Sequence, residues 1–130
     1  MDIQQFIAAL REIEERADVE PMVGLFAPDA RLWSPEREEP LVGSEGARQF
    51  WQSYRDTFGT IESSFRTIIT AKDDAALEWE STGTLRANNQ RIYYRGVTIL
   101  DWAGDQIKRL AVYFDPRRLE VVWPARAARR

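Results

Sequence analysis

The chain has 130 residues, with 18 Lys and Arg against 21 Asp and Glu, which gives a net charge of −3. A chain of this length forms one domain and can bury a core without disulfides or a structural metal. It contains no His and no Cys, which excludes a His-based triad, a thiol nucleophile, an Fe–S cluster and the usual N/S zinc site. Any catalysis must therefore use carboxylates, hydroxyls, Lys, Arg or a metal held by oxygen.

Charge and hydropathy patterns limit the partners. Both signs of charge are interspersed and no basic stripe is present, so no nucleic-acid partner is predicted. The apolar runs are short and an acidic residue comes early at the N-terminus, which predicts no membrane span, no secretory signal and a cytoplasmic location. The basic C-terminal end, with Arg126, Arg129 and Arg130, is expected to be a frayed tail rather than a partner site. We therefore predict a domain at 1–119 and a tail at 120–130.

Three helices are predicted in the first half of the chain. Apolar residues recur at steps of three and four over residues 2–16, which is typical of an amphipathic helix. Capping and breaking residues delimit the other two: the second helix is capped by Asp18, carries Pro21 in its first turn and ends at Ala27-Pro28-Asp29, and the third is capped by Ser44 and stopped by Gly59.

Strands dominate the second half. A short strand is predicted at 30–34, and segments rich in Thr, Ile, Val and aromatic residues predict four more at 61–71, 77–87, 91–102 and 106–114. Helices followed by an antiparallel meander predict an α+β domain with the helices on one face of a curved sheet.

Turn residues predict which side chains share a face of this sheet. If Asn88-Asn89 is a two-residue turn, Leu85 lies opposite Ile92, and a three-residue turn at 104–106 places Leu100 opposite Leu110. One face is then mainly apolar and lies under the helices, while the other is charged. Apolar residues among those charges predict a homodimer through this outer face; they are Tyr93, Val97, Ile99, Ala111 and Tyr113.

Three segments resemble a known family in their order and spacing: LFAPDARLWSP, YYRGVTILDWAGDQI and RLAVYFDPRRL. They are similar to the SnoaL-like branch of the nuclear transport factor 2 superfamily, which also holds ketosteroid isomerase, limonene epoxide hydrolase and polyketide cyclases. The resemblance extends to about Leu119. It implies a cone, that is, a strongly curved antiparallel sheet closed by three N-terminal helices around an internal pocket, usually in a homodimer.

The catalytic residues of these relatives are absent from this chain. The position of the isomerase base is Ser34, and the isomerase oxyanion donors fall near Leu10 and Val97. The working Asp of the cyclases and epoxide hydrolases corresponds to Val112. The hairpin Arg and Asp of the epoxide hydrolases fall near Ser81 and Gly83.

Asp115 is the candidate catalytic base, because it closes the YFD segment. The face assignment instead puts it outside, opposite Arg95, where an ion pair or a dimer contact explains it, unless a bulge turns it inward. The predicted ligand-binding residues have apolar, aromatic or neutral polar side chains on the inner face or the helices that cover it: Leu32, Ser34, Trp51, Tyr54, Trp79, Ser81, Leu85, Ile92, Tyr94, Leu110, Val112 and Phe114. The Trp and Tyr residues have an alternative role in the core.

No metal and no cofactor are predicted. Asp73 and Asp74 form a turn, Glu78 and Glu80 lie on the solvent face, and Glu12, Glu14 and Glu15 belong to the polar face of a helix. Glycine-rich phosphate loops are also absent.

Two functions remain. One is a cofactor-free isomerase, cyclase or dehydratase acting on a small, mainly apolar molecule. The other is a ligand-binding or dimerisation module without chemistry. A carboxylate buried at the pocket floor favours the enzyme, and the absence of one favours the binding module.

Overall fold

The computed structural model describes residues 1–119, and the predicted tail 120–130 lies outside the described residues. Helices and strands follow in the order α1 (Ile3–Arg16), α2 (Glu20–Val23), β1 (Phe26–Trp33), β2 (Leu41–Val42), α3 (Gly43–Thr57), β3 (Phe58–Thr70), β4 (Asp74–Leu85), β5 (Arg91–Ala103), β6 (Gln106–Phe114) and the 3₁₀ turn η1 (Pro116–Leu119). The α+β class is confirmed.

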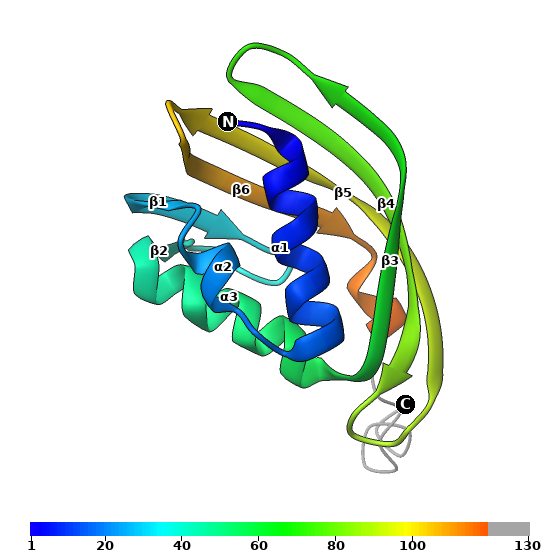
Figure 1. Cartoon of the computed structure of the whole chain (residues 1–130). Helices are drawn as coiled ribbons and strands as arrows, with labels where there is room; N and C mark the ends of the chain where they lie inside the picture. Colours follow the sequence, from blue (N-terminus) through cyan, green and yellow to red (C-terminus); the bar gives the residue numbers. More distant parts are fainter. Residues whose placement is uncertain (120–130) are drawn as a thin grey trace.

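The strands form one curved, unclosed sheet in the order β2-β1-β6-β5-β4-β3. The sheet is mixed, because β1 runs parallel to β6 while the other neighbours are antiparallel. The prediction of a purely antiparallel sheet was therefore wrong at this pair. The long strands β3, β4 and β5 curve around the helices, which lie on one face (Figure 1).

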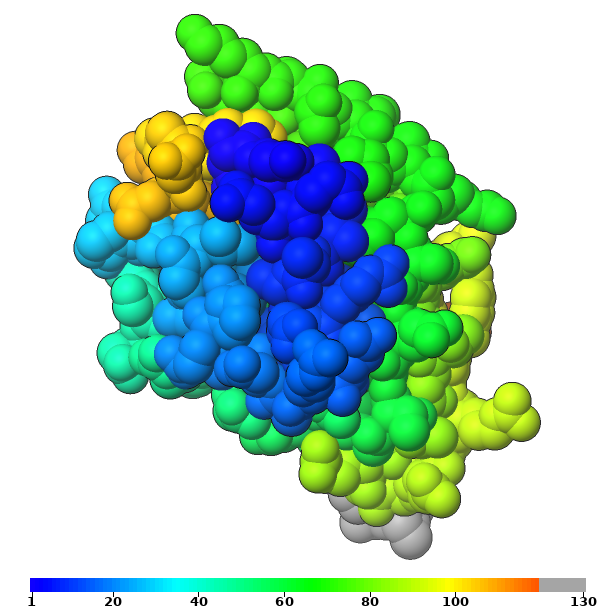
Figure 2. All heavy atoms as spheres, viewed as in Figure 1, coloured from blue at the N-terminus to red at the C-terminus, as the bar shows by residue number. Residues whose placement is uncertain are grey.

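Helix α1 forms because its ends are capped and one of its faces is apolar. The Asp2 carboxylate accepts from the Gln4 amide at 2.9 Å, and the Gln5 side chain accepts from the Asp2 amide at 3.3 Å. Ala17 ends the helix in the left-handed conformation, with φ 58°. In the space-filling view α1 and α2 (blue) cover the sheet, with β3 (green) alongside (Figure 2).

Three predicted helix boundaries were wrong. Helix α2 has only four residues, and Ala27-Pro28-Asp29 belongs to β1, where the pairing with β6 is irregular between Phe26 and Arg31 and so tolerates the missing proline amide. Helix α3 begins at Gly43 without a side-chain cap from Ser44. Gly59 does not stop α3 but lies inside β3, which follows α3 directly.

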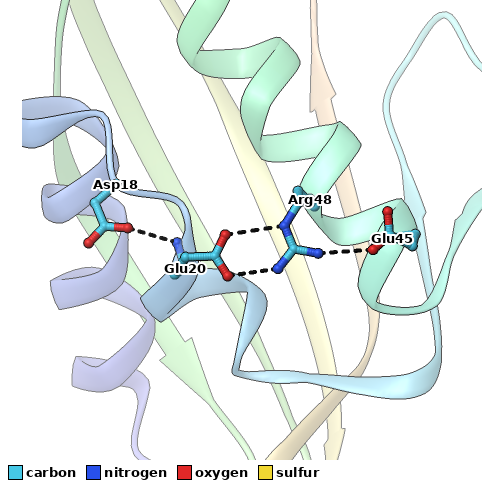
Figure 3. A network of polar contacts seen from close by, with 4 residues as sticks. All are labelled: Asp18, Glu20, Glu45 and Arg48. Atoms are coloured by element: carbon cyan, nitrogen blue, oxygen red, sulfur yellow. Dashed lines mark hydrogen bonds and ion pairs between the residues drawn. The ribbon is translucent and has the colours of Figure 1, made fainter.

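A charged cluster connects α2 to α3 on the surface (Figure 3). The Arg48 guanidinium donates to both Glu20 oxygens, at 2.7 and 3.1 Å, and to Glu45 Oε1 at 3.1 Å. Asp18 Oδ1 accepts from the Glu20 amide at 3.1 Å. These groups are exposed, so their ion pairs add little to the stability of the fold.

The β5–β6 register was predicted correctly, with Leu100 opposite Leu110. The turn differs, since Ala103 pairs with Gln106 and an irregularity follows at Asp101–Trp102. In the β4–β5 hairpin Ile92 lies opposite Gly83 rather than Leu85, because the turn is longer than two residues. A shift by two residues keeps every side chain on its face, so the predicted faces are unaffected.

Candidate functional site

A cavity of about 160 Å³ lies between α1, α3 and the inner face of the sheet. Its lining is mainly aromatic and aliphatic: Phe6, Leu10, Phe50, Trp51, Tyr54, Phe58, Phe65, Trp79, Tyr94, Val112, Phe114 and Leu119. The other lining residues are polar: Ser34, Glu36, Arg37, Ser53, Thr57, Ser63, Ser81 and Thr98. This composition is typical of small-molecule sites, which combine an apolar wall with a few polar groups.

The structure places eight of the predicted ligand-binding residues around this cavity: Ser34, Trp51, Tyr54, Trp79, Ser81, Tyr94, Val112 and Phe114. Four others do not line it. Leu32 and Leu110 are fully buried in the main core, and Leu85 and Ile92 pack in the smaller cluster around Phe58. They were assigned to the pocket because they share its face of the sheet, but other side chains fill the space beside them.

A chain of aromatic contacts surrounds the cavity. Tyr54 packs edge-on against Trp51 and Phe58, with ring centroids 5.6 and 5.5 Å apart. Tyr94 stacks on Phe58 at 6.0 Å and meets Trp79 edge-on at 5.1 Å. Because each ring is held by its neighbours, the wall is preformed rather than assembled around a ligand.

Gly96 makes room for this wall. It lies opposite Trp79 in the β4–β5 pair and opposite Phe114 in the β5–β6 pair. A Cβ at this position would overlap the Tyr113 carbonyl oxygen, and would also come within 2.8 Å of the Trp79 ring and 3.0 Å of the Phe114 Cβ. The absence of a side chain therefore lets both aromatic residues turn towards the cavity.

The structure reveals a buried carboxylate beside the cavity, Glu14 of α1, which is 7 % exposed. Glu14 Oε2 accepts from the Tyr54 hydroxyl and from the Ser63 hydroxyl, both at 2.6 Å, and Oε1 accepts from the Ser63 amide at 3.0 Å. Ser63 Oγ lies 2.6 Å from Ser81 Oγ. Three of these residues, Tyr54, Ser63 and Ser81, line the cavity, whereas Glu14 lies behind them.

The assignment of Glu14 to a polar helix face was wrong. Glu14 follows Leu10 by four residues and Ile7 by seven, which puts it on the buried stripe of α1. The flanking Glu12 and Glu15 concealed this position, because three acidic residues close together look like a solvated surface. The helical spacing was the signal that could have identified it.

The two tyrosines of the cavity remain protonated over a wide pH range. Burial raises the pKa of Tyr54 well above its ordinary value, and the nearby Tyr94 and Glu14 raise it further. Burial, together with the charge of Glu14, also raises the pKa of Tyr94. Tyr54 is therefore a hydrogen-bond donor to Glu14 and not a phenolate.

Two polar groups on the aromatic residues of the cavity lack partners within residues 1–119. The Tyr94 hydroxyl makes no hydrogen bond to the described residues, and neither does the buried Trp51 Nε1. The Trp79 Nε1, in contrast, donates to Thr98 Oγ1 at 2.9 Å. Tyr94 in particular has hydrogen-bonding capacity left for a ligand.

Asp115, the predicted base, does not line the cavity. Its carboxylate accepts from the Arg117 amide at 3.0 Å and from the Arg117 guanidinium at 2.9 Å, at the start of η1. These hydrogen bonds from Arg117 lower its pKa. The expected ion pair with Arg95 is replaced by this local pair, because the chain leaves the sheet after Phe114.

The described residues were also compared with the requirements of a metal site and of a membrane span. Residues 1–119 contain no group of three acidic side chains able to hold a metal ion. None of the helices of these residues is long and apolar enough to cross a membrane.

The fold resembles many solved structures. An NTF2-like protein from Anabaena variabilis superposes with a TM-score of 0.78 at 20% identity, over 87% of this chain and 86% of that one. A proposed isomerase from Rhodopseudomonas palustris gives 0.76 at 14%, over 98% and 96%. A proposed SnoaL-like polyketide cyclase from Jannaschia sp. gives 0.72 at 14%, over 86% of both chains. These similarities establish the fold alone.

Family membership follows from the sequence itself. No curated protein matches the chain significantly. The SnoaL-like domain, however, matches residues 3–110, which is most of the chain and includes both α1 with Glu14 and α3 with Tyr54. The chain therefore belongs to the SnoaL-like family.

Proposed function

We propose that this protein binds a small, mainly apolar molecule in the cavity between α1, α3 and the sheet. The supporting observation is the cavity itself, with about 160 Å³ of space walled by aromatic rings. A dry cavity of about 150 Å³ is large enough to hold a benzene ring. Polar groups of Tyr54, Ser63, Ser81 and Tyr94 interrupt this apolar wall, and they would orient a ligand rather than solvate it.

Toluene binding tests this proposal. Wild-type protein should bind toluene, with a change in tryptophan fluorescence, because Trp51 and Trp79 line the cavity. Val112→Arg should abolish the binding by placing an unpaired charge in the cavity. Val42→Arg is the matched control, since Val42 is 52% exposed and does not line the cavity. Absence of toluene binding to the folded wild-type protein would contradict the proposal.

The buried Glu14 supports a catalytic form of this function, a cofactor-free isomerase, cyclase or dehydratase. A proton adjacent to a ligand carbonyl would pass to Tyr54 Oη while the Tyr54 proton passes to Glu14, and the electron pair left behind would move onto the carbonyl oxygen. The similar proteins from Rhodopseudomonas and Jannaschia carry names for chemistry of this kind. The rival, a binding module without chemistry, is supported by Ser34 and Val112 at the positions of the relatives' catalytic residues.

Hydrogen–deuterium exchange of cyclohexanone distinguishes the two. The catalytic form predicts that the protein accelerates exchange of the α protons in D₂O, measured by proton NMR, and that Tyr54→Phe abolishes the acceleration. A binding module predicts bound cyclohexanone with no acceleration.

We also propose that two copies associate through the outer face of the sheet. The supporting observation is that Tyr93 and Tyr113 are 47% and 58% exposed there, so their rings are accessible to a second copy. One chain has a mass of 15.1 kDa. Light scattering should give twice this mass for the wild-type protein and the single-chain mass for Tyr113→Arg. The cytoplasmic location stays a prediction.

A further inference from the structure

The direction of the hydrogen bonds around Glu14 determines what the cavity wall can offer a ligand. A carboxylate has only acceptor atoms, so the protons of Tyr54 Oη and Ser63 Oγ both point to Glu14 Oε2, each at 2.6 Å. With its own proton committed, Ser63 Oγ can only accept from Ser81 Oγ, 2.6 Å away. All three hydroxyl protons are thus directed away from the ligand space and towards the carboxylate.

On the cavity side Tyr54 and Ser81 are therefore left with lone pairs only, whereas the Tyr94 hydroxyl, which has no partner among residues 1–119, can still donate or accept. Tyr54 and Ser81 both line the cavity, and a hydroxyl oxygen that donates its only proton still accepts. No described residue donates to Ser81 Oγ other than the neighbouring Ser63 hydroxyl, whose proton is already used. Tyr54 Oη has only the distant Ser63 Oγ, at 3.5 Å, besides Glu14.

We propose that Glu14 turns the Tyr54 and Ser81 part of this wall into a hydrogen-bond-accepting site, which selects a ring compound carrying a hydroxyl group that donates to Tyr54 or Ser81. The inference rests on the proposed function and adds the ligand's chemical class. The size of the cavity sets the ring at about one aromatic or cyclohexane unit inside it. Because the oxygens are held by a buried network, they face the ligand without reorganisation.

Phenol and toluene are the matched probes, since they have the same shape and differ only in a hydroxyl in place of a methyl group. An apolar cavity without an acceptor would bind phenol about tenfold or more weakly than toluene, because the hydroxyl would lose its water partners. Calorimetric titration of the full chain should instead show phenol binding at least as tightly as toluene.

Variants then locate the acceptor. Tyr54→Phe combined with Ser81→Ala removes both oxygens, and should lower the ratio of phenol to toluene affinity by tenfold or more while toluene binding changes less than twofold. Tyr93→Phe is the control, because Tyr93 also donates to a glutamate, Glu80 at 2.9 Å, but on the exposed outer face. It should leave the ratio unchanged.

Glu14→Gln tests whether Glu14 sets the direction of the hydrogen bonds made by Tyr54 and Ser81. The Ser63 amide donates to Glu14 Oε1 and both hydroxyls donate to Oε2. In the amide only one of these positions is an acceptor, so with the amide oxygen on the Ser63 N–H the NH2 group donates to the two hydroxyl oxygens. Their protons are then no longer committed to residue 14, and the ratio should fall here as well. If this variant does not fold, the Tyr54→Phe, Ser81→Ala variant still decides the question.

The two proposals fail in different ways. Absence of toluene and phenol binding would overturn the proposed function. Toluene binding with phenol tenfold weaker in the wild-type protein, or a ratio unchanged by removal of both hydroxyls, would overturn the inference and leave the cavity's function standing.

Discussion

The inner face of the sheet has two halves in which side chains alternate in the same way along the strands. One half is filled by side chains, and the other borders the cavity. Leu77, Leu100 and Leu110 lie in one half and are fully buried against α1 and α2. Two residues further along the same three strands lie Trp79, Thr98 and Val112, which line the cavity. Mainly aliphatic side chains, with Phe26 and Trp102 among them, fill the first half. In the second half, large flat rings pack against each other edge-on and leave a hollow between them.

The comparison is tested most strongly by truncating one residue in each half. Leu100→Ala should lower the free energy of unfolding by about 2–5 kcal/mol, because it opens a cavity in a filled core. Val112→Ala should have a clearly smaller effect, since its side chain already borders empty space and the deletion only enlarges it. Urea denaturation measures both. Equal losses would show that the two halves are packed alike.

Gly96 provides the next test, because it lies between Trp79 and Phe114, two residues that line the cavity. Gly96→Ala should lower the free energy of unfolding by about 1–3 kcal/mol, since the new Cβ would overlap the Tyr113 carbonyl oxygen and crowd the Trp79 ring. Gly24→Ala is the control, because a Cβ there meets nothing closer than 3.5 Å. Toluene affinity should also fall in Gly96→Ala, and a variant as stable as the wild type would contradict the role given to this glycine.

The sequence was sufficient to predict the shared face and eight of the twenty residues that line the cavity. Alternation along β4, β5 and β6 identified Trp79, Ser81, Tyr94 and Val112, since each strand has a strict period of two. It did not distinguish these residues from Leu110, which lies on the same face but is buried in the core. The periodicity of one strand predicts the face of a side chain, whereas the position of a cavity depends on the size of all the side chains packed around it. The parallel pairing of β1 with β6 was missed for a similar reason: a contact between segments distant along the chain leaves no local pattern.

The pH dependence of stability at alkaline pH tests the cavity half, where Tyr54 and Tyr94 lie. The buried residues of the main core include no tyrosine, although Tyr54 also packs against them. The pKa values of Tyr54 and Tyr94 are raised by folding. Their contribution to stability is therefore complete below the unfolded value near pH 10 and is lost as the pH rises above it. The free energy of unfolding should decrease by about 1.4 kcal/mol per pH unit for each tyrosine. Tyr94→Phe should reduce this slope, and an unchanged slope would show that Tyr94 is not buried in its protonated form.

The smallest effect is expected at Asp115, where a carboxylate outside the cavity can be compared with Glu14 beside it. Asp115 is bound by Arg117 at the exposed start of η1. Its lowered pKa stabilises the fold at neutral pH, and that contribution is lost only as the pH falls through the folded-state value. Asp115→Asn should therefore leave toluene affinity, phenol selectivity and cyclohexanone exchange unchanged at pH 7, whereas Glu14→Gln should change phenol selectivity. If Asp115→Asn abolished exchange in a folded protein that still bound toluene, the reacting carboxylate would be Asp115. The chain end after Phe114 would then have to turn inwards when a ligand binds.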